Sequence, residues 1–224
     1  MRINIDEMIA IPIPPKTKTF EPLEYEFIFD QVKKLSGGFK ILDHSIETTS
    51  SGGIVSGYLD VSRSSDPYPV RIYFESSYSK QIRTRLALGI LVHGKPFFFD
   101  SFTSDMRHHS GVREYFIDYT KKVRENLVKC ASEAAPVIRD MSGMFFDATQ
   151  CASLLGDLFY RGIVTGQQLK IIRSRMRRIK MIGGDLRDAM TVILDIGEIL
   201  EMSHPIRRID NHYLFYDLLY ERYF

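Results

Sequence analysis

The spacing of apolar residues changes from alternating to helical after Gly111, and that change limits the folds open to this chain. Between positions 39 and 102 apolar and polar residues alternate, which is typical of half-buried strands. After Gly111 the apolar residues recur at helical spacing, as in the stripe that contains Val112, Phe116 and Val123. Strands followed by helices, without strand–helix alternation, are the pattern of an α+β fold.

The alternating half predicts an antiparallel sheet of four or five strands. Gly52 and Gly53 lie in a turn typical of a hairpin, and Gly94 lies in a second such turn. The bulky residues of 70–74 favour a central strand. Strands are expected at 39–49, 54–61, 70–74, 86–92 and 97–102.

Helices are expected before the sheet and throughout the second half. Gly37 and Gly38 are typical of a helix end. Pro136 is expected to close the long helix that follows Gly111, because proline interrupts helical hydrogen bonding. Asp147 and Asp210 are candidate N-caps. The helices are expected at 25–35, 112–135, 148–160, 167–182, 186–202 and 213–223.

These patterns divide the chain into three segments. Residues 1–22 contain four prolines, a density that predicts an extended, proline-rich N-terminal arm. Residues 23–135 form the α+β sheet region, and residues 136–224 form the helical region. We expect the helices to pack on the sheet, so that the chain folds as one cooperative domain.

Composition narrows the class of protein. With 44% hydrophobic and 26% charged residues, the chain is typical of globular proteins and not of disordered ones. The formal net charge is only +2, so a charged partner would have to be recognised by a local cluster. Cys130 and Cys151 lack the spacing of zinc ligands. A zinc ribbon or finger is therefore excluded, and neither a metal nor a cofactor is expected.

The sequence also predicts where the protein is found. Asp6 and Glu7 occur early and no long apolar run follows them, which argues against a signal peptide. No apolar stretch approaches the roughly 20 residues that a membrane helix needs. Two isolated cysteines are typical of reduced thiols in a cytoplasm. We expect a soluble cytoplasmic protein with no membrane partner.

Several short motifs occur in an order that resembles a known family. They are Ser76-Ser77-Tyr78-Ser79-Lys80-Gln81, then Gly89, then Phe97-Phe98-Phe99-Asp100, then Arg107-His108-His109-Ser110. The proline-rich start and the aromatic segment 211–221 match the same pattern. The chain thus resembles small phage proteins related to the phage/plasmid-like family called domain of unknown function 932. The resemblance implies a phage or mobile-element origin, hence the cytoplasm of a host bacterium, and it implies no activity.

A run of cations in the second half is the most informative local feature. Lys170, Arg173, Arg177 and Lys180 share one side of the expected basic helix, and no acid occurs between positions 169 and 182. Apolar residues cover the adjacent side and are expected to face the core. Four cations along about 15 Å of helix can track successive phosphates. Pairing with acids of neighbouring helices and a merely solvated face are the alternatives.

A second basic cluster is expected beside the sheet. Its histidines precede the helix that starts near Gly111, whose free N–H groups favour an anion. The alternative is that the histidines cap or pack. Adjacent histidines diverge and are poor metal ligands, so no metal site is expected. The cluster consists of Lys80, Arg83, Arg107, His108 and His109.

Aromatic residues on the strands offer a further way to bind single-stranded nucleic acid. Phe97 to Phe102 are apolar on both faces, which favours a buried strand over a base-stacking platform. Tyr58, Tyr73 and Tyr78 would stack bases if they shared an exposed face.

The sequence favours a non-enzymatic phage accessory protein that binds nucleic acid, including single strands, through the two basic clusters. It contains no glycine-rich phosphate loop, no HExxH and no Gly-x-Ser-x-Gly, so no catalytic residues are expected. One alternative is an interaction protein that inhibits or redirects a host defence or transcription protein through its aromatic C-terminal helix. Another is a structural homo-oligomer.

Overall fold

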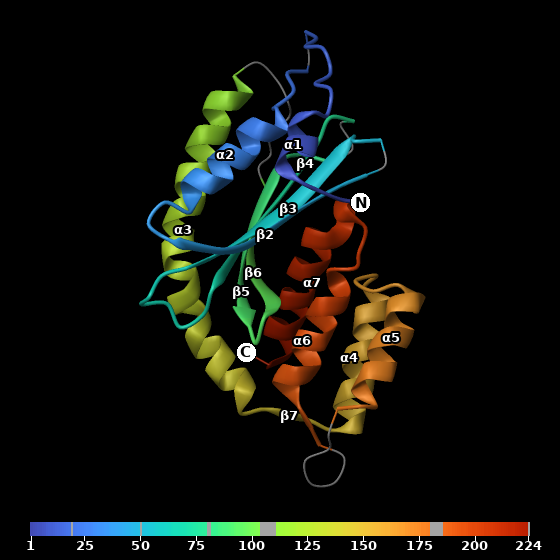
Figure 1. The fold of residues 1–224 in the computed structure, drawn as a ribbon. Coiled ribbons are helices and arrows are strands. Elements are labelled where there is room, and N and C mark those ends of the chain that lie inside the picture. The colour runs from blue at the N-terminus through green and yellow to red at the C-terminus, as the bar shows by residue number, and fades with distance from the viewer. Residues whose placement is uncertain (19, 50, 80–81, 104–110, 180–185, 224) are drawn as a thin grey trace. The chain divides into compact units, whose positions relative to one another are not determined.

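The computed structural model describes residues 1–18, 20–49, 51–79, 82–103, 111–179 and 186–223 (Figure 1). The strands are β1 (Arg2–Ile3), β2 (Lys40–Thr48), β3 (Ile54–Ser62), β4 (Val70–Ser77), β5 (Arg85–Val92), β6 (Lys95–Thr103), β7 (Phe145–Phe146) and β8 (Arg187–Asp188). The helices are α1 (Ile5–Ile9), α2 (Tyr25–Leu35), α3 (Val112–Ser142), α4 (Ala148–Tyr160), α5 (Gly166–Met176), α6 (Ala189–Leu200) and α7 (Pro205–Tyr223).

The chain forms two compact units. Unit 1 consists of Met1–Ile90 and Asp100–Ala131, and it holds most of the sheet. Unit 2 consists of Leu91–Phe99 and Ser132–Phe224, and it is mostly helical. Strands therefore dominate the first half of the sequence and helices the second, which confirms the α+β class.

The main sheet has the order β1-β2-β3-β4-β5-β6, so that each strand pairs with its neighbours in sequence. It has six strands, and the prediction of four or five was too low. The additional strand is β1, which pairs antiparallel with β2 through Arg2 opposite Glu47. β4 lies inside the sheet and every one of its residues is buried, as the bulky segment 70–74 predicted.

The start of the chain is more ordered than an extended arm. Asn4 caps α1, because its side chain accepts a hydrogen bond from Glu7 N and the Glu7 carboxylate accepts one from Asn4 N, both at 2.8 Å. Met8 of this helix is 1% exposed. A two-residue strand and a five-residue helix are too short to produce a periodic signal, which is why the sequence predicted neither.

The sheet of unit 1 contains buried ion pairs. Arg71 on β4 stands directly opposite Asp60 on β3 and donates two hydrogen bonds to its carboxylate, at 2.7 and 2.9 Å. The Arg71 guanidinium also lies over the ring of Tyr58, 3.6 Å from its centroid. On the next strand pair, Arg85 lies 3.2 Å from the fully buried Glu75. Burying these charges requires such partners.

Helix α3 is longer than predicted. It continues through Pro136 to Ser142, so the expectation that Pro136 closes it was wrong. A proline inside a helix costs about 3 kcal/mol, and burial of apolar side chains beyond it offsets that cost. Ile138 and Met141 are both almost fully buried.

Unit 2 contains helices α4 to α7 (Figure 1). In sequence order each contacts the next. The hairpin end 91–99 belongs to this unit. Phe97 packs edge-on against Tyr216 and Phe98 lies against His212, with ring centroids 6.0 and 4.4 Å apart. Phe97 and Phe98 are both buried, which confirms the core interpretation for these two residues.

Several helix boundaries in unit 2 differ from the prediction. Asp147 caps α4 as expected. Before α6, the short strand β8 occupies the first residues of the predicted helix, and Asp188 is the N-cap. Helix α7 begins at Pro205, so Asp210 lies inside it and does not cap it. Proline is favoured in the first turn of a helix, where its missing N–H has no partner to lose.

Across the described ranges, no helix is both long and apolar enough to cross a membrane.

Candidate functional site

The basic helix predicted at 167–182 is shorter in the structure. Helix α5 spans Gly166–Met176, Arg177 is its C-cap, and residues 177–179 form a turn. Thr165 begins the helix with a capping box: its hydroxyl accepts from Gln168 N at 3.2 Å, and Gln168 Oε1 accepts from Thr165 N at 2.9 Å. The four predicted cations therefore do not all lie on one helix, and Lys180 lies outside the described residues.

The three described members of the predicted row face solvent. Lys170, Arg173 and Arg177 are exposed, whereas Ile172 and Met176 are buried on the adjacent side of α5. We call these three cations the basic row. Within the part of the chain that the structure describes, no carboxylate lies within ion-pair distance of them. The basic row thus spans about 10 Å of helix length with its charges open to water.

Another arginine of the same helix behaves differently. Arg175 is half-buried and its guanidinium lies 2.9 Å from the Glu198 carboxylate on α6. Glu198 also pairs with Lys95 at 3.0 Å. The hydrogen bond from Lys95, followed by that from Arg175, lowers the pKa of the Glu198 carboxyl. Intramolecular pairing, one of the alternatives for the cation run, therefore applies to Arg175 and not to the basic row.

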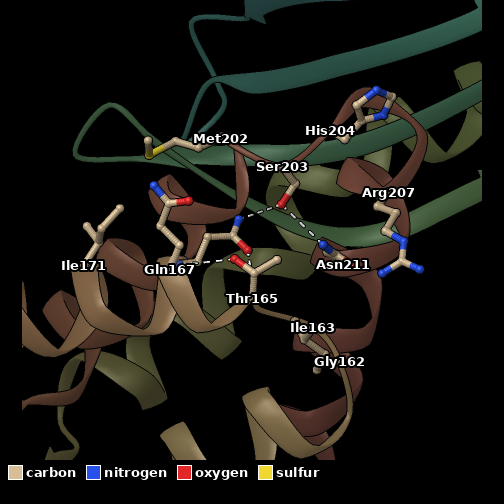
Figure 2. Close-up of a pocket in the computed structure, with 11 residues that line it drawn as sticks. Gly162, Ile163, Thr165, Gln167, Ile171, Met202, Ser203, His204, Arg207 and Asn211 are labelled. Atoms are coloured by element: carbon tan, nitrogen blue, oxygen red, sulfur yellow. Dashed lines mark hydrogen bonds between the residues drawn. The ribbon is translucent and has the colours of Figure 1, made fainter.

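A cavity of about 300 Å³ opens on a neighbouring side of α5 (Figure 2). Gln167 and Ile171 of α5 form one side of it, and Asn211 and Arg207 of α7 form the other. The segment 202–204 borders it between them. The cavity lies wholly within unit 2. It is lined by Gly162, Ile163, Thr165, Gln167, Gln168, Ile171, Met202, Ser203, His204, Arg207 and Asn211.

Three nearly buried polar side chains are hydrogen-bonded to one another in this cavity. Gln168 Nε2 donates to Ser203 Oγ at 3.0 Å, and Asn211 Nδ2 donates to the same oxygen at 3.3 Å (Figure 2). Gln168 Nε2 also lies 3.3 Å from the carbonyl oxygen of Ile199. The exposed fractions are 9% for Gln168, 8% for Ser203 and 7% for Asn211. The network fixes these side chains and connects α5 to α7 through Ser203, in the segment between α6 and α7.

The second predicted cluster falls largely outside what the structure describes. Lys80, Arg107, His108 and His109 all lie outside the described residues. Arg83 is described, and it is an exposed residue of the segment that leads into β5. Whether these five side chains meet is therefore still a prediction.

The tyrosines suggested as a base-stacking platform do not share an exposed face. Tyr73 is completely buried. The ring of Tyr58 is covered by the Arg71 guanidinium. The ring of Tyr78 stacks on Tyr25, with centroids 3.8 Å apart. These rings already have partners in the fold, so that stacking hypothesis was wrong.

Sequence reasoning missed the cavity. Its polar side chains come from α5, from the segment between α6 and α7, and from α7. Glutamine, serine and asparagine carry no charge and form no motif, so only the packing of α5, α7 and the segment before α7 brings them together. The one available signal was Thr165 and Gln168, which have the spacing of a capping box.

Comparison with known proteins adds no relative: the chain matches no protein-family model, no curated protein and no solved structure.

Proposed function

We propose that this protein binds nucleic acid, and that the basic row on α5 holds its phosphates. The observation that carries the proposal is that Lys170, Arg173 and Arg177 face solvent without a described carboxylate partner. The nearby Arg175, by contrast, is neutralised by Glu198. Cations that the fold does not use are available to an external anion.

The spacing of the basic row suits a phosphate backbone. Successive members are separated by about 4.5 and 6 Å along the helix axis, so that adjacent side chains can reach neighbouring phosphates. Each such contact releases condensed counterions, and binding then weakens with salt. Three contacts predict that affinity falls roughly 20- to 40-fold between about 50 and 200 mM salt. The net charge of +2 is too small to give this effect without a local cluster.

A titration of labelled oligonucleotides tests the proposal. Fluorescence anisotropy is measured with single-stranded DNA, single-stranded RNA and duplex DNA over a salt series. The variant Lys170→Gln/Arg173→Gln/Arg177→Gln removes three charges, and we expect the salt dependence of its affinity to be nearly flat.

The matched control removes three exposed lysines from unit 1 instead. Lys34→Gln/Lys40→Gln/Lys122→Gln changes the net charge by the same amount but leaves α5 intact. We expect its salt dependence to equal that of the wild type. Equal losses of affinity in both variants would show that net charge alone drives binding. A wild-type slope of log affinity against log salt near zero would exclude phosphate contacts by the basic row.

A second candidate function is binding of a protein partner through α7. Tyr213 and Tyr220 are 41% and 57% exposed, and Tyr216 lies between them in sequence, with its ring centroid 6.3 Å from that of Tyr220. Tyrosine is enriched at the energetic centres of interfaces. A pulldown from nuclease-treated host lysate separates the two functions. A protein retained by the wild type and lost with Tyr213→Ser/Tyr220→Ser supports this second function, whereas a protein lost on nuclease treatment supports the first.

A further inference from the structure

We propose that the cavity beside the basic row receives one base of the bound strand. This inference rests on the proposed function, because the basic row would hold the phosphates on either side of the base. The expected ligand group is a nucleotide: a planar ring with a hydrogen-bonding edge and an attached phosphate. The same group could come from a strand or from a free mononucleotide.

The Ser203 hydroxyl provides a donor for that edge. Its oxygen already accepts hydrogen bonds from Gln168 Nε2 and Asn211 Nδ2. A serine hydroxyl has two acceptor lone pairs and one O–H donor, so its remaining capacity is to donate. Among the described residues, none accepts a hydrogen bond from this hydroxyl, although Ser203 is only 8% exposed. A nearly buried hydroxyl with an unused donor is an unfavourable arrangement unless a ligand or water supplies the acceptor.

The Asn211 amide provides the matching acceptor. Its nitrogen is used in the bond to Ser203, while no described residue donates to its Oδ1. Because Ser203 and Asn211 are in hydrogen-bond contact, a donor and an acceptor lie next to each other in the cavity. Every nucleobase carries an adjacent donor and acceptor on its Watson–Crick edge, so the pair is complementary to a base and does not select one base over another.

The size and the walls of the cavity suit a ring. At about 300 Å³ it lies at the small end of ligand pockets. Ile163, Ile171 and Met202 provide apolar surface around the polar network. Apolar side chains on either side of a flipped base and polar groups at its edge are the usual composition of base pockets.

The basic row and the cavity are close enough to act on one strand. Ile171 lines the cavity and Lys170 precedes it directly, so their side chains diverge by about 100° around α5. Arg207, on the other side of the cavity, is exposed, and no described carboxylate pairs with it. A strand whose phosphates follow the row can therefore place a base in the cavity and an adjacent phosphate near Arg207.

The experiment compares an oligonucleotide that carries bases with one that has the same backbone but no bases. Anisotropy is measured with a short oligothymidine and with an oligomer of the same length built from abasic residues. We expect the wild type to bind the oligothymidine roughly tenfold more tightly. Met202→Trp fills the mouth of the cavity from an exposed position, and it should abolish this difference between the two oligomers. Thr149→Trp, on the exposed face of α4, is the matched control and should keep the difference.

A second arm uses free uridine 5′-monophosphate, followed by two-dimensional NMR. Saturable shifts at Ser203 and Asn211, lost in Met202→Trp, are expected. If both oligomers bind equally and the nucleotide produces no saturable shift, the base pocket is wrong while the basic row stands. If neither oligomer binds, the proposed function fails, and the nucleotide arm alone decides the pocket: saturable shifts support it and their absence overturns it.

Discussion

The arginines of the sheet in unit 1 and those of α5 in unit 2 show two uses of the same side chain. Arg71 is 8% exposed, forms two hydrogen bonds with Asp60 and covers the Tyr58 ring. Arg173 and Arg177 are exposed to solvent, and no described carboxylate pairs with them. A buried charge must be paired for the protein to fold, whereas an exposed one contributes little to stability. The difference indicates which charges serve the fold and which are open to a ligand.

The largest effect is expected from breaking the buried pair. Asp60→Ala leaves Arg71 buried without its carboxylate, and this should lower the free energy of unfolding by about 3–5 kcal/mol. Urea denaturation measures it. The double variant Asp60→Leu/Arg71→Met removes both charges, and its free energy of unfolding should fall much less. A single variant as stable as the wild type would mean that this ion pair is not a structural requirement of unit 1.

The next effect concerns the start of the helix that carries the basic row. Thr165→Ala removes the side-chain acceptor for Gln168 N, and loss of such a cap costs about 1 kcal/mol. Thr165→Ser keeps the hydroxyl and should keep most of that stability. Chemical denaturation of both variants checks the expectation. Equal stability of the alanine and serine variants would contradict the role of the capping box.

The Glu198 pair should have a smaller, pH-dependent effect. Its pKa in the folded protein lies below the ordinary value of 4.5 because of the hydrogen bonds from Lys95 and Arg175. Its contribution is therefore complete above that value and is lost as the pH falls through the lowered pKa. Since the side chain is 42% exposed, the contribution is limited to about 0.5–1 kcal/mol.

Thermal melts over a pH series test this expectation. Glu198→Gln should lower stability at neutral pH and flatten its decline in acid. Glu133→Gln, an exposed carboxylate on α3, is the control and should leave the decline unchanged. A pH profile of Glu198→Gln identical to that of the wild type would show that this group does not contribute.

The smallest effect on stability is expected from the basic row itself. Lys170→Gln/Arg173→Gln/Arg177→Gln should change the free energy of unfolding by no more than about 0.5 kcal/mol, because no described ion pair is lost. The same variant is the one expected to lose nucleic-acid affinity. A loss of stability comparable to that of Asp60→Ala would instead place the row among the structural charges and remove the basis of the proposed function.

Much of the architecture was predictable because it depends on local spacing. The alternation between 39 and 102 located β2 to β6, and the apolar stripe that begins at Val112 located α3. The prediction failed where elements were short or where packing outweighed local preference. The two residues of β1 are too few to show a period, and α3 continues through Pro136 because the residues beyond it are buried.

For the candidate site, the sequence determined that Lys170, Arg173 and Arg177 would share one side of a helix, since helical spacing follows from residue number alone. Only the tertiary structure decided that Arg175 is paired with Glu198 while the row faces water. It also decided that Gln168, Ser203 and Asn211 meet around a cavity. Pairing and cavity formation depend on distances between separate helices, and no pattern within one segment encodes those distances.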